Sequence, residues 1–283
     1  MRLLVTGASS FVGAHFCVRA SARHEVLALH HSTPMRLNQM TPIKADLRTA
    51  RDRARVKGED FDVVVHLATK VKGSGAQQTN RALMDSVLGF GRPVIYASST
   101  VVHWESASPY RESRREDERR LAESGLDWVT VRPSAPYGPR LINHQPRHKE
   151  SFHTLAEWVQ NSRLVPVIGN GCYRRQPIHV HDFADAMLAF LDRGLPGRAF
   201  DAGGSQALSF NEIIDTIAGA ANRRVKKLHL PKALFVQMAR MSGDFDPDLI
   251  RSVDEDEAAD MYELSEAAGV RLRPFSEGVQ CLI

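Results

Sequence analysis

The sequence predicts an α/β fold with a doubly wound parallel sheet and a smaller α/β region at the C-terminal end. Two observations predict it: short apolar segments of strand length recur over the first 132 residues, and segments that can form helices separate them. Apolar strands that alternate with helices are typical of a parallel sheet covered on both faces. A chain of 283 residues, 43% of them hydrophobic, can fill such a core.

The elements of the first part follow in order. The expected strands are Arg2–Thr6, Glu25–Leu29, Ile43–Ala45, Asp62–His66, Pro93–Ala97 and Trp128–Arg132. Apolar residues at helical spacing predict a helix from Phe11 to about Ala22. A segment dense in charge, ended by Gly125, predicts a solvated amphipathic helix over Ser113–Ser124.

Beyond Arg132 the pattern becomes irregular, because prolines and glycines interrupt a long connection that also holds several His and Arg residues. Helices are expected over 151–162, 182–192, 210–221 and 232–241, and a strand over Leu164–Ile168. We therefore predict a first domain over 1–145 and a mixed region over 146–283. Segments at about 176–202 are expected to return to the core.

Charge and cysteine content limit the classes of partner. The formal net charge is +4, but Lys and Arg are spread along the chain, which favours a phosphorylated small molecule over a nucleic acid. Three widely spaced cysteines, Cys17, Cys172 and Cys281, indicate neither a disulfide framework nor a metal site. No segment resembles a signal peptide or a membrane span. We expect a cytoplasmic protein without metal, nucleic-acid or membrane partners.

The turn after the first strand reads Gly7-Ala8-Ser9-Ser10-Phe11-Val12-Gly13. Glycines at its two ends permit a sharp turn and let phosphates approach a helix N-terminus closely. With a strand on each side of this turn and helix, the pattern predicts a Rossmann-type dinucleotide site for NAD(P). Its phosphate-binding residues would be Gly7, Ser9, Ser10, Phe11, Val12 and Gly13; a plain strand-to-helix connection is the alternative.

The end of the second strand bears on the choice between NAD and NADP. An acidic residue there would bind the ribose hydroxyls of NAD, but the chain has His30 and His31, with Arg36 nearby. Because no carboxylate repels a 2′-phosphate, these residues favour NADP, unless they are simply exposed loop residues. After the third strand, Asp46 and Leu47 are placed to contact adenine, although Asp is also a common turn residue.

Four motifs now stand in order along the chain. They are Thr6 to Gly13, His66-Leu67-Ala68, Ser98-Ser99 followed by Tyr110-Arg-Glu-Ser-Arg114, and Arg132-Pro133-Ser-Ala-Pro-Tyr137-Gly138-Pro139. Together they resemble the extended or atypical short-chain dehydrogenase/reductases, the NAD-dependent epimerase/dehydratase family, which often acts on nucleotide sugars. The resemblance extends to about residue 202, through Arg174-Arg175-Gln-Pro-Ile-His-Val-His-Asp182, and more faintly to Arg273-Pro274-Phe275-Ser-Glu-Gly278.

The resemblance implies roles for individual residues. Ser99 resembles the hydroxyl that polarises a substrate carbonyl, with Ser98 and Thr100 as neighbouring substitutes and Thr100 also a substrate contact. Tyr110 resembles the catalytic acid/base; alternatively, it is a surface tyrosine at the start of a charged helix. The cofactor would also contact Leu67, Ala68, Thr69 and Pro133.

The chain departs from the family at three places. The family has a lysine four residues after the tyrosine, which supplies positive charge and holds the nicotinamide ribose, whereas this chain has Arg114. Ser10 replaces a central glycine of the phosphate-binding turn, and Val102-His103-Trp104 stands where Val-Tyr-Gly is common. Arg175 matches an arginine that binds a nucleotide-sugar diphosphate, although a solvent-facing pair with Arg174 is as good an explanation.

These features predict an NAD(P)-dependent oxidoreductase or epimerase/dehydratase that acts on a nucleotide sugar or a similar carbonyl or hydroxyl compound. Its catalytic residues would be Ser99, Tyr110 and Arg114. The alternative is a protein of the same fold that binds NAD(P) as a structural or sensing ligand without catalysis. Dimerisation through two sheet-flanking helices is common in the family, so a homodimer is compatible with the resemblance.

Overall fold

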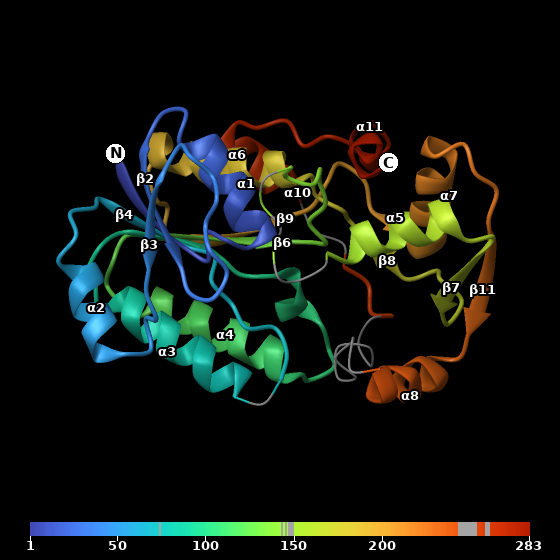
Figure 1. The fold of residues 1–283 in the computed structure, drawn as a ribbon, viewed down its shortest axis with the longest axis horizontal. Helices are drawn as coiled ribbons and strands as arrows, with labels where there is room; N and C mark the ends of the chain where they lie inside the picture. The colour runs from blue at the N-terminus through green and yellow to red at the C-terminus, as the bar shows by residue number, and fades with distance from the viewer. Residues whose placement is uncertain (74, 143, 145, 147–149, 243–253, 258–260) are drawn as a thin grey trace.

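The computed structural model describes residues 1–283 except 74, 143, 145, 147–149, 243–253 and 258–260 (Figure 1). Within the described residues, seven parallel strands form one sheet in the order β3-β2-β1-β4-β5-β6-β9. These strands are β1 (Arg2–Thr6), β2 (Glu25–His30), β3 (Thr41–Lys44), β4 (Val63–His66), β5 (Val94–Ala97), β6 (Trp128–Pro133) and β9 (Arg198–Ala202). The Rossmann-type parallel sheet expected from the sequence is therefore confirmed.

The order of the strands creates a switch point between β1 and β4. The chain begins at β1, adds β2 and β3 on one side, and then continues with β4 on the other side of β1. Ligands of open α/β sheets bind outside the carboxyl ends of the strands at such a reversal. The sheet thus places the glycine-rich turn, which follows β1, at the expected position for a ligand.

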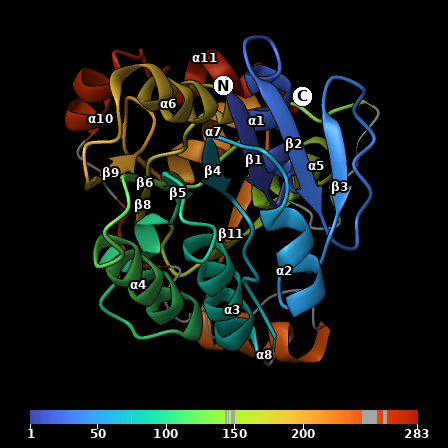
Figure 2. The same ribbon diagram turned by 90° about the vertical axis from the view of Figure 1, so that its left-hand side faces the viewer.

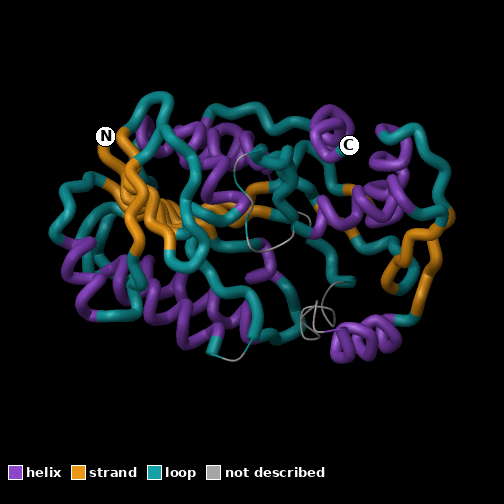
Figure 3. The backbone as a smooth tube through the Cα atoms, in the orientation of Figure 1, coloured by secondary structure: helices purple, strands orange, loops and turns teal. Residues whose placement is uncertain are grey.

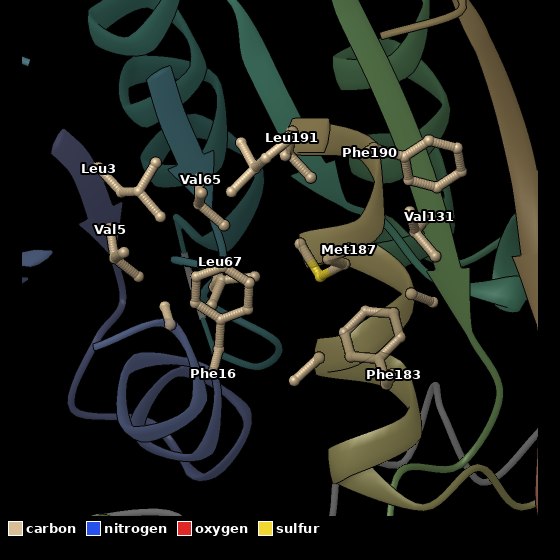
Figure 4. Close-up of a cluster of buried hydrophobic side chains, with 14 of the residues drawn as sticks. Leu3, Val5, Phe16, Val65, Leu67, Val131, Phe183, Met187, Phe190 and Leu191 are labelled. Atoms are coloured by element: carbon tan, nitrogen blue, oxygen red, sulfur yellow. The ribbon is translucent and has the colours of Figure 1, made fainter. Parts of the chain in front are cut away.

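Helices cover both faces of the sheet (Figures 1 and 2). One face carries α1 (Phe11–Ala20), α6 (Val180–Arg193) and α10 (Met261–Ala268), and the other carries α2 (Ala50–Lys57), α3 (Ala76–Leu88) and α4 (Pro109–Ala122). Figure 4 shows the core beneath α1 and α6, where Phe16 and Met187 meet Val5, Val65 and Val131 from the strands. Such buried apolar side chains on both faces explain why the strands are almost continuously hydrophobic.

A second, smaller region lies beyond the carboxyl edge of the sheet and has its own core (Figure 3). Two small pairs of strands form within it: β7 with β11 in parallel, and β8 with β10 in antiparallel orientation. Its elements are α5 (Ser151–Asn161), β7 (Leu164–Ile168), β8 (Arg174–Arg175), β10 (Leu208–Ser209), α7 (Phe210–Ala220), β11 (Lys226–Leu230), α8 (Lys232–Ser242), α11 (Phe275–Gly278) and η2 (Val279–Leu282). This is the C-terminal α/β region that the sequence predicts.

The chain passes between the two regions more than once. After β6 it enters the smaller region, and it returns through α6, which packs against α1, and β9, which pairs with β6. Arg19 of α1 and Asp185 of α6 form a two-bonded ion pair at 2.5 and 2.7 Å. A division of the chain at residue 145 stays a prediction.

Several elements differ at their ends from the sequence prediction. The charged helix α4 begins at Pro109 instead of Ser113, because the Ser108 side chain caps it and proline fits the first helical turn.

None of the helices in the described part of the chain is long and apolar enough to cross a membrane.

Candidate functional site

The turn between β1 and α1 leaves no room for side chains at its two outer glycines. Gly7 has φ of +70°, and a Cβ there would lie 2.6 Å from the backbone nitrogen of Ala68. A Cβ on Gly13 would lie 2.1 Å from the carbonyl oxygen of Gly7. These close backbone approaches need glycine and hold the turn against the end of β4. The geometry fits the pyrophosphate of a dinucleotide, which requires backbone close to a helix N-terminus.

Ser10 is the residue before α1 and caps this helix. Its side-chain oxygen accepts a hydrogen bond from the backbone N–H of Gly13 at 3.0 Å. The hydroxyl that replaces the family's glycine therefore stabilises the helix start. Ser10 is exposed, Ser9 and Val12 are half-buried, and Phe11 is buried. The hydroxyl hydrogen of Ser10 is left to donate to an anion at the helix end.

The ends of β2 and β3 bring acid and base together. His30 is half-buried, and its pKa is lowered by burial and by the charges of Lys44 and His31. His31 and Arg36 are exposed. Asp46 lies beside them: it binds Arg48 with two hydrogen bonds, at 2.7 and 2.8 Å, and one of its carboxylate oxygens is 3.5 Å from Nε2 of His31. A carboxylate therefore does stand at this edge, supplied by a different strand from the one where the sequence motif would place it.

Hydrogen bonds from Arg48 are the main reason why the pKa of Asp46 falls to about 2. Its negative charge is thus present throughout the neutral range, next to the residues that favour a 2′-phosphate. Leu47, which follows, is buried beneath the turn, and its carbonyl accepts a hydrogen bond from Ser86 at 2.7 Å. The Leu47 side chain is therefore shielded from an adenine at this edge, whereas Asp46 is half-buried.

The remaining residues expected to contact the cofactor lie at the carboxyl ends of β4 and β6. Leu67 is buried, and Ala68 donates its backbone N–H to the hydroxyl of Thr6 at 3.3 Å. Thr69 is exposed, and Pro133 ends β6. The topology brings these residues to the same edge as the glycine-rich turn, which is consistent with one dinucleotide site.

Ser99 and Thr100 follow β5 at this edge. Ser99 is half-buried, and its hydroxyl accepts a hydrogen bond from the backbone N–H of Val101 at 3.4 Å, which starts the short 3-10 helix η1 (Thr100–His103). Thr100 is buried. The neighbouring Ser98 is also buried, and its hydroxyl has no hydrogen-bond partner among the described residues. The Val-His-Trp segment forms the rest of this turn, where Trp104 is buried and His103 contacts Asp201 at 2.9 Å.

Tyr110 and Arg114 lie one turn apart on α4, which begins beyond the end of β5. The guanidinium of Arg114 lies over the ring of Tyr110, 5.4 Å from its centroid, and at the same distance over the ring of Tyr96. Arg114 is only 1% exposed, and its Nη2 donates to Asp117 at 2.9 Å. The structure thus brings the expected pair together, with the positive charge beneath the tyrosine ring and tied to a carboxylate.

A chain of buried polar groups continues from Arg114 toward β1. The hydroxyl of Tyr96 donates to Asp117 at 3.2 Å, and the His66 ring stacks on Tyr96. His66 Nδ1 lies 2.7 Å from the hydroxyl of Thr6. Burial, with the nearby charge of Arg114, lowers the pKa of His66 to about 3. The imidazole is therefore neutral, and the guanidinium is the positive charge of this part of the core.

Arg175 does not point to solvent as the simplest alternative required. It is buried, lies over the rings of Tyr173 and Trp104, and its Nε is 3.6 Å from a carboxylate oxygen of Glu257. Glu257 belongs to an acidic stretch near Asp254 to Asp260. Residues 258–260 of that stretch lie outside the described part of the chain, as does Asn143 in the long connection after β6.

Histidines that sequence reasoning missed join the smaller region to the glycine-rich turn. His15 Nε2 donates to the carbonyl of Pro139 at 3.0 Å, which leaves its Nδ1 to accept from Nε2 of His181 at 3.1 Å. His153 donates to the carbonyl of Gly138 at 2.8 Å, and His144 donates to that of Ser9 at 2.9 Å. Because the partners are distant in sequence, only the fold brings these rings together.

The fold and this edge define a class of protein. The chain belongs to the NAD dependent epimerase/dehydratase family, whose model matches residues 3–118 and 85–203. Among proteins of known activity, it is similar to a dTDP-4-dehydro-6-deoxy-D-allose reductase from Streptomyces, with 27% identity over 93% of this chain and 96% of the relative.

Solved structures show the same fold. A UDP-glucose 4-epimerase from Thermotoga maritima, determined with UDP-glucose, superposes with a TM-score of 0.80 at 17% identity over 100% of this chain and 97% of the other. A UDP-glucose 4-epimerase from Thermus thermophilus, determined with NAD, gives 0.79 at 22% identity over the same shares. At these identities the likeness establishes the fold alone.

Proposed function

We propose that this protein is an NAD(P)-dependent oxidoreductase or epimerase/dehydratase that acts on a hydroxyl- or carbonyl-bearing carbon of a nucleotide sugar or a similar compound. The observation that carries the proposal is the contact of the Arg114 guanidinium with the Tyr110 ring on α4, the helix that comes after β5 and Ser99 in the chain. Family membership supplies the class of reaction, and the named relatives act on nucleotide sugars according to their names.

The cofactor residues of this proposal line the carboxyl edge of the sheet. The N–H groups at the start of α1 and the Ser10 hydroxyl would hold the pyrophosphate, because Gly7 and Gly13 leave the backbone accessible. Thr69 and Pro133 would border the cofactor farther along this edge. When bound, NAD(P) supplies a carbon that accepts or donates hydride.

The chain's own residues would handle the proton and orient the substrate. The Tyr110 phenol would take or return the proton of the reacting hydroxyl, and the Ser99 hydroxyl would donate a hydrogen bond to its oxygen. The guanidinium of Arg114 gives negative charge on the phenol a stabilising neighbour at the ring face. The hydrogen bond from its Nη2 to Asp117 fixes this position and uses one of the guanidinium's donors within the core.

Two groups act in opposite directions on the choice of cofactor. His30, His31 and Arg36 favour the 2′-phosphate of NADP, as the sequence suggests, whereas the Asp46 carboxylate next to His31 repels it. Three basic or titratable groups against one carboxylate that Arg48 already neutralises favour NADP. Fluorescence titrations with NADPH and NADH at the same ionic strength measure this preference.

One observation favours a second function, in which the protein binds NAD(P) as a structural or sensing ligand. Arg114 is fully buried and ion-paired with Asp117, so its guanidinium has less freedom than the family's lysine to contact a ribose. Incubation with cofactor and a panel of nucleotide sugars and simple carbonyl compounds separates the two functions, since only an enzyme changes the absorbance of the nicotinamide or the composition of the panel.

Replacement of Tyr110 by Phe tests the catalytic assignment. We expect turnover to fall by roughly 10²–10⁴-fold, because general acid/base catalysis contributes that much. The affinity for the cofactor should stay unchanged. Tyr262→Phe, at a 68% exposed tyrosine on α10, is the matched control and should retain wild-type turnover. Full turnover by Tyr110→Phe would refute the role given to this phenol.

The proposal also covers setting and assembly. It places the protein in the cytoplasm with a small-molecule substrate as its partner, and it permits a homodimer through sheet-flanking helices. Light scattering during gel filtration measures the mass in solution directly.

A further inference from the structure

Four consecutive acidic residues, Asp254 to Glu257, cross the carboxyl edge of the sheet near Ser99, and each carboxylate has a partner. Asp254 pairs with Lys232 at 2.6 Å, and Glu255 accepts the backbone N–H groups of Glu105 and Ser106. Asp256 accepts the N–H of Arg174 at 2.7 Å. The segment is therefore anchored by bonds from β8 and from the loop between η1 and α4. We call it the acidic strap.

The carboxylate of Glu257 lies in an anion site that two regions of the fold build together. One of its oxygens accepts hydrogen bonds from the hydroxyls of Thr100 and Ser134, each at 3.1 Å. The other lies 3.6 Å from Nε of Arg175. All four side chains are more than nine-tenths buried. Two hydroxyl donors and a guanidinium around one point form a receptor for an anion, and a residue of the chain itself fills it.

This anion site adjoins the proposed catalytic residues. Thr100 directly follows Ser99, and Ser134 directly follows Pro133 at the end of β6. By the family resemblance, Arg175 matches an arginine that binds the diphosphate of a nucleotide sugar. A substrate held over Ser99 and Tyr110 would therefore meet the Glu257 carboxylate at the place where a diphosphate would need Arg175.

We propose that Glu257 determines the charge of the substrate: with its carboxylate in this site, the protein accepts an uncharged hydroxyl or carbonyl compound and excludes a diphosphate ester. The proposal rests on the proposed function for the position of the substrate. Within that function, the proposal excludes nucleotide sugars, which carry a diphosphate, and leaves similar hydroxyl or carbonyl compounds without a phosphate.

Charge balance supports this exclusion. The strap itself carries four carboxylates, whereas its contacts with described basic residues are with the side chains of Arg175 and Lys232 and with the backbone of Arg174. A diphosphate at Arg175 would place negative charge beside the buried Glu257 carboxylate, where repulsion is poorly screened. Removal of the Glu257 charge takes this repulsion away and leaves less negative charge beside the buried guanidinium.

The test measures anion binding by wild type and Glu257→Gln in saturating NADPH, which occupies the proposed pyrophosphate site at the start of α1. The probes are UDP and inorganic pyrophosphate, with uridine as the uncharged probe, and the readouts are calorimetry and the shift of the unfolding midpoint. We expect Glu257→Gln to bind UDP and pyrophosphate about tenfold or more tightly than wild type, because the charge that repels an anion is gone while the guanidinium and the two hydroxyls remain. Uridine binding should not change.

Controls separate this effect from a general change of charge. Glu263→Gln removes a carboxylate that pairs with Arg198 on the exposed surface, and it should bind UDP as wild type does. If Glu257→Gln does not fold, Glu255→Gln loosens the strap at its backbone anchor without exposing a buried charge. We expect it to raise UDP affinity by about threefold, since a rim charge has a smaller effect than a buried one.

Equal UDP affinity of Glu257→Gln and wild type would overturn the proposal, as would tight UDP binding by wild type itself. Because no readout involves the nicotinamide or Tyr110, failure here differs from failure of the proposed function. The latter would show as an absence of turnover or as full activity of Tyr110→Phe.

Discussion

Arg114 shows how one substitution can change the environment of a proposed catalytic position. A lysine carries a flexible, compact charge, whereas a guanidinium is planar and stacks on aromatic rings. In this chain the guanidinium lies over the rings of both Tyr96 and Tyr110 and is ion-paired with Asp117. The charge is therefore kept near the phenol, and its position is fixed by the core.

Arg114→Met should strongly destabilise the fold. The substitution leaves the buried Asp117 carboxylate without its counter-charge, which costs about 3–5 kcal/mol in the free energy of unfolding. Urea unfolding monitored by circular dichroism measures this loss. Arg119→Met on the same helix removes an exposed arginine and should change stability little. Equal stability of both variants would show that the buried pair contributes nothing.

The sequence could identify Arg114 as a departure but not its consequence. The spacing from Tyr110 is visible in the chain, and the helix that brings them together follows from the periodicity. Tyr96, the other ring that Arg114 contacts, is a strand residue whose neighbours depend on the packing of β5 against α4. Glu257 illustrates the same limit more strongly, because nothing in its sequence context links it to Thr100 or Ser134.

Helix α1 combines two functions in its first turn. Its N-terminus supplies N–H groups to the glycine-rich turn proposed to bind the pyrophosphate, and Gly13 lets the helix pack directly on the carbonyl of Gly7. Glycine is a poor helix former, but at position 13 the close approach of the Gly7 backbone requires it.

Two glycine substitutions in helices should have opposite effects. Gly13→Ala puts a Cβ against backbone and should lower the free energy of unfolding by about 1–3 kcal/mol, with weaker cofactor binding. Gly219→Ala in α7 meets no atom within 4 Å and should raise it by about 0.5–1 kcal/mol, because alanine favours a helix. Thermal unfolding with and without NADPH measures both effects. Stabilisation by Gly13→Ala would contradict the close approach.

Elements were predictable where a local pattern determines them. The strands β1, β4, β5 and β6 are apolar runs, and their positions agree with the sequence to within one residue at most ends. The strand β9 was not predicted, because Arg198-Ala-Phe-Asp-Ala202 has too few apolar residues to stand out. It forms because β6 offers a free edge and Phe200 reaches the core.

At the scale of the whole molecule, buried and half-buried histidines connect α1, α6 and the segment before α5. His15 on α1 and His181 on α6 contact each other. His15 and His153 also donate hydrogen bonds to backbone carbonyls of the loop before α5. Burial is the main cause that lowers the pKa of His15 and of His179 to about 4. These imidazoles are neutral in the folded protein at pH 7.

Stability should therefore fall on acidification. A folded-state pKa below the unfolded value of about 6.5 means that the unfolded chain binds more protons between the two values. The free energy of unfolding is full above about pH 6.5 and declines as the pH drops toward 4. Urea midpoints at several pH values measure the slope. His15→Gln should flatten it, whereas His31→Gln at an exposed histidine should not.

The fold and part of the proposed site could be predicted from the sequence for one physical reason. The glycine-rich turn, Ser99 and Tyr110 each lie at the end of a local element, and parallel strands bring all such ends to one edge. Contacts between distant segments, such as Asp46 with His31 or Glu257 with Arg175, depend on how loops cross that edge.

The position of β9 at the edge of the sheet has a consequence for synthesis on the ribosome. The chain completes β6 at Pro133, but β9, the strand that pairs with the free edge of β6, is complete only at Ala202. The helix α6, which packs against α1, is made just before β9. Until then the nascent chain exposes an unpaired strand edge and the apolar face beneath α6. The dinucleotide-binding half thus reaches its final form only after much of the smaller region has been translated.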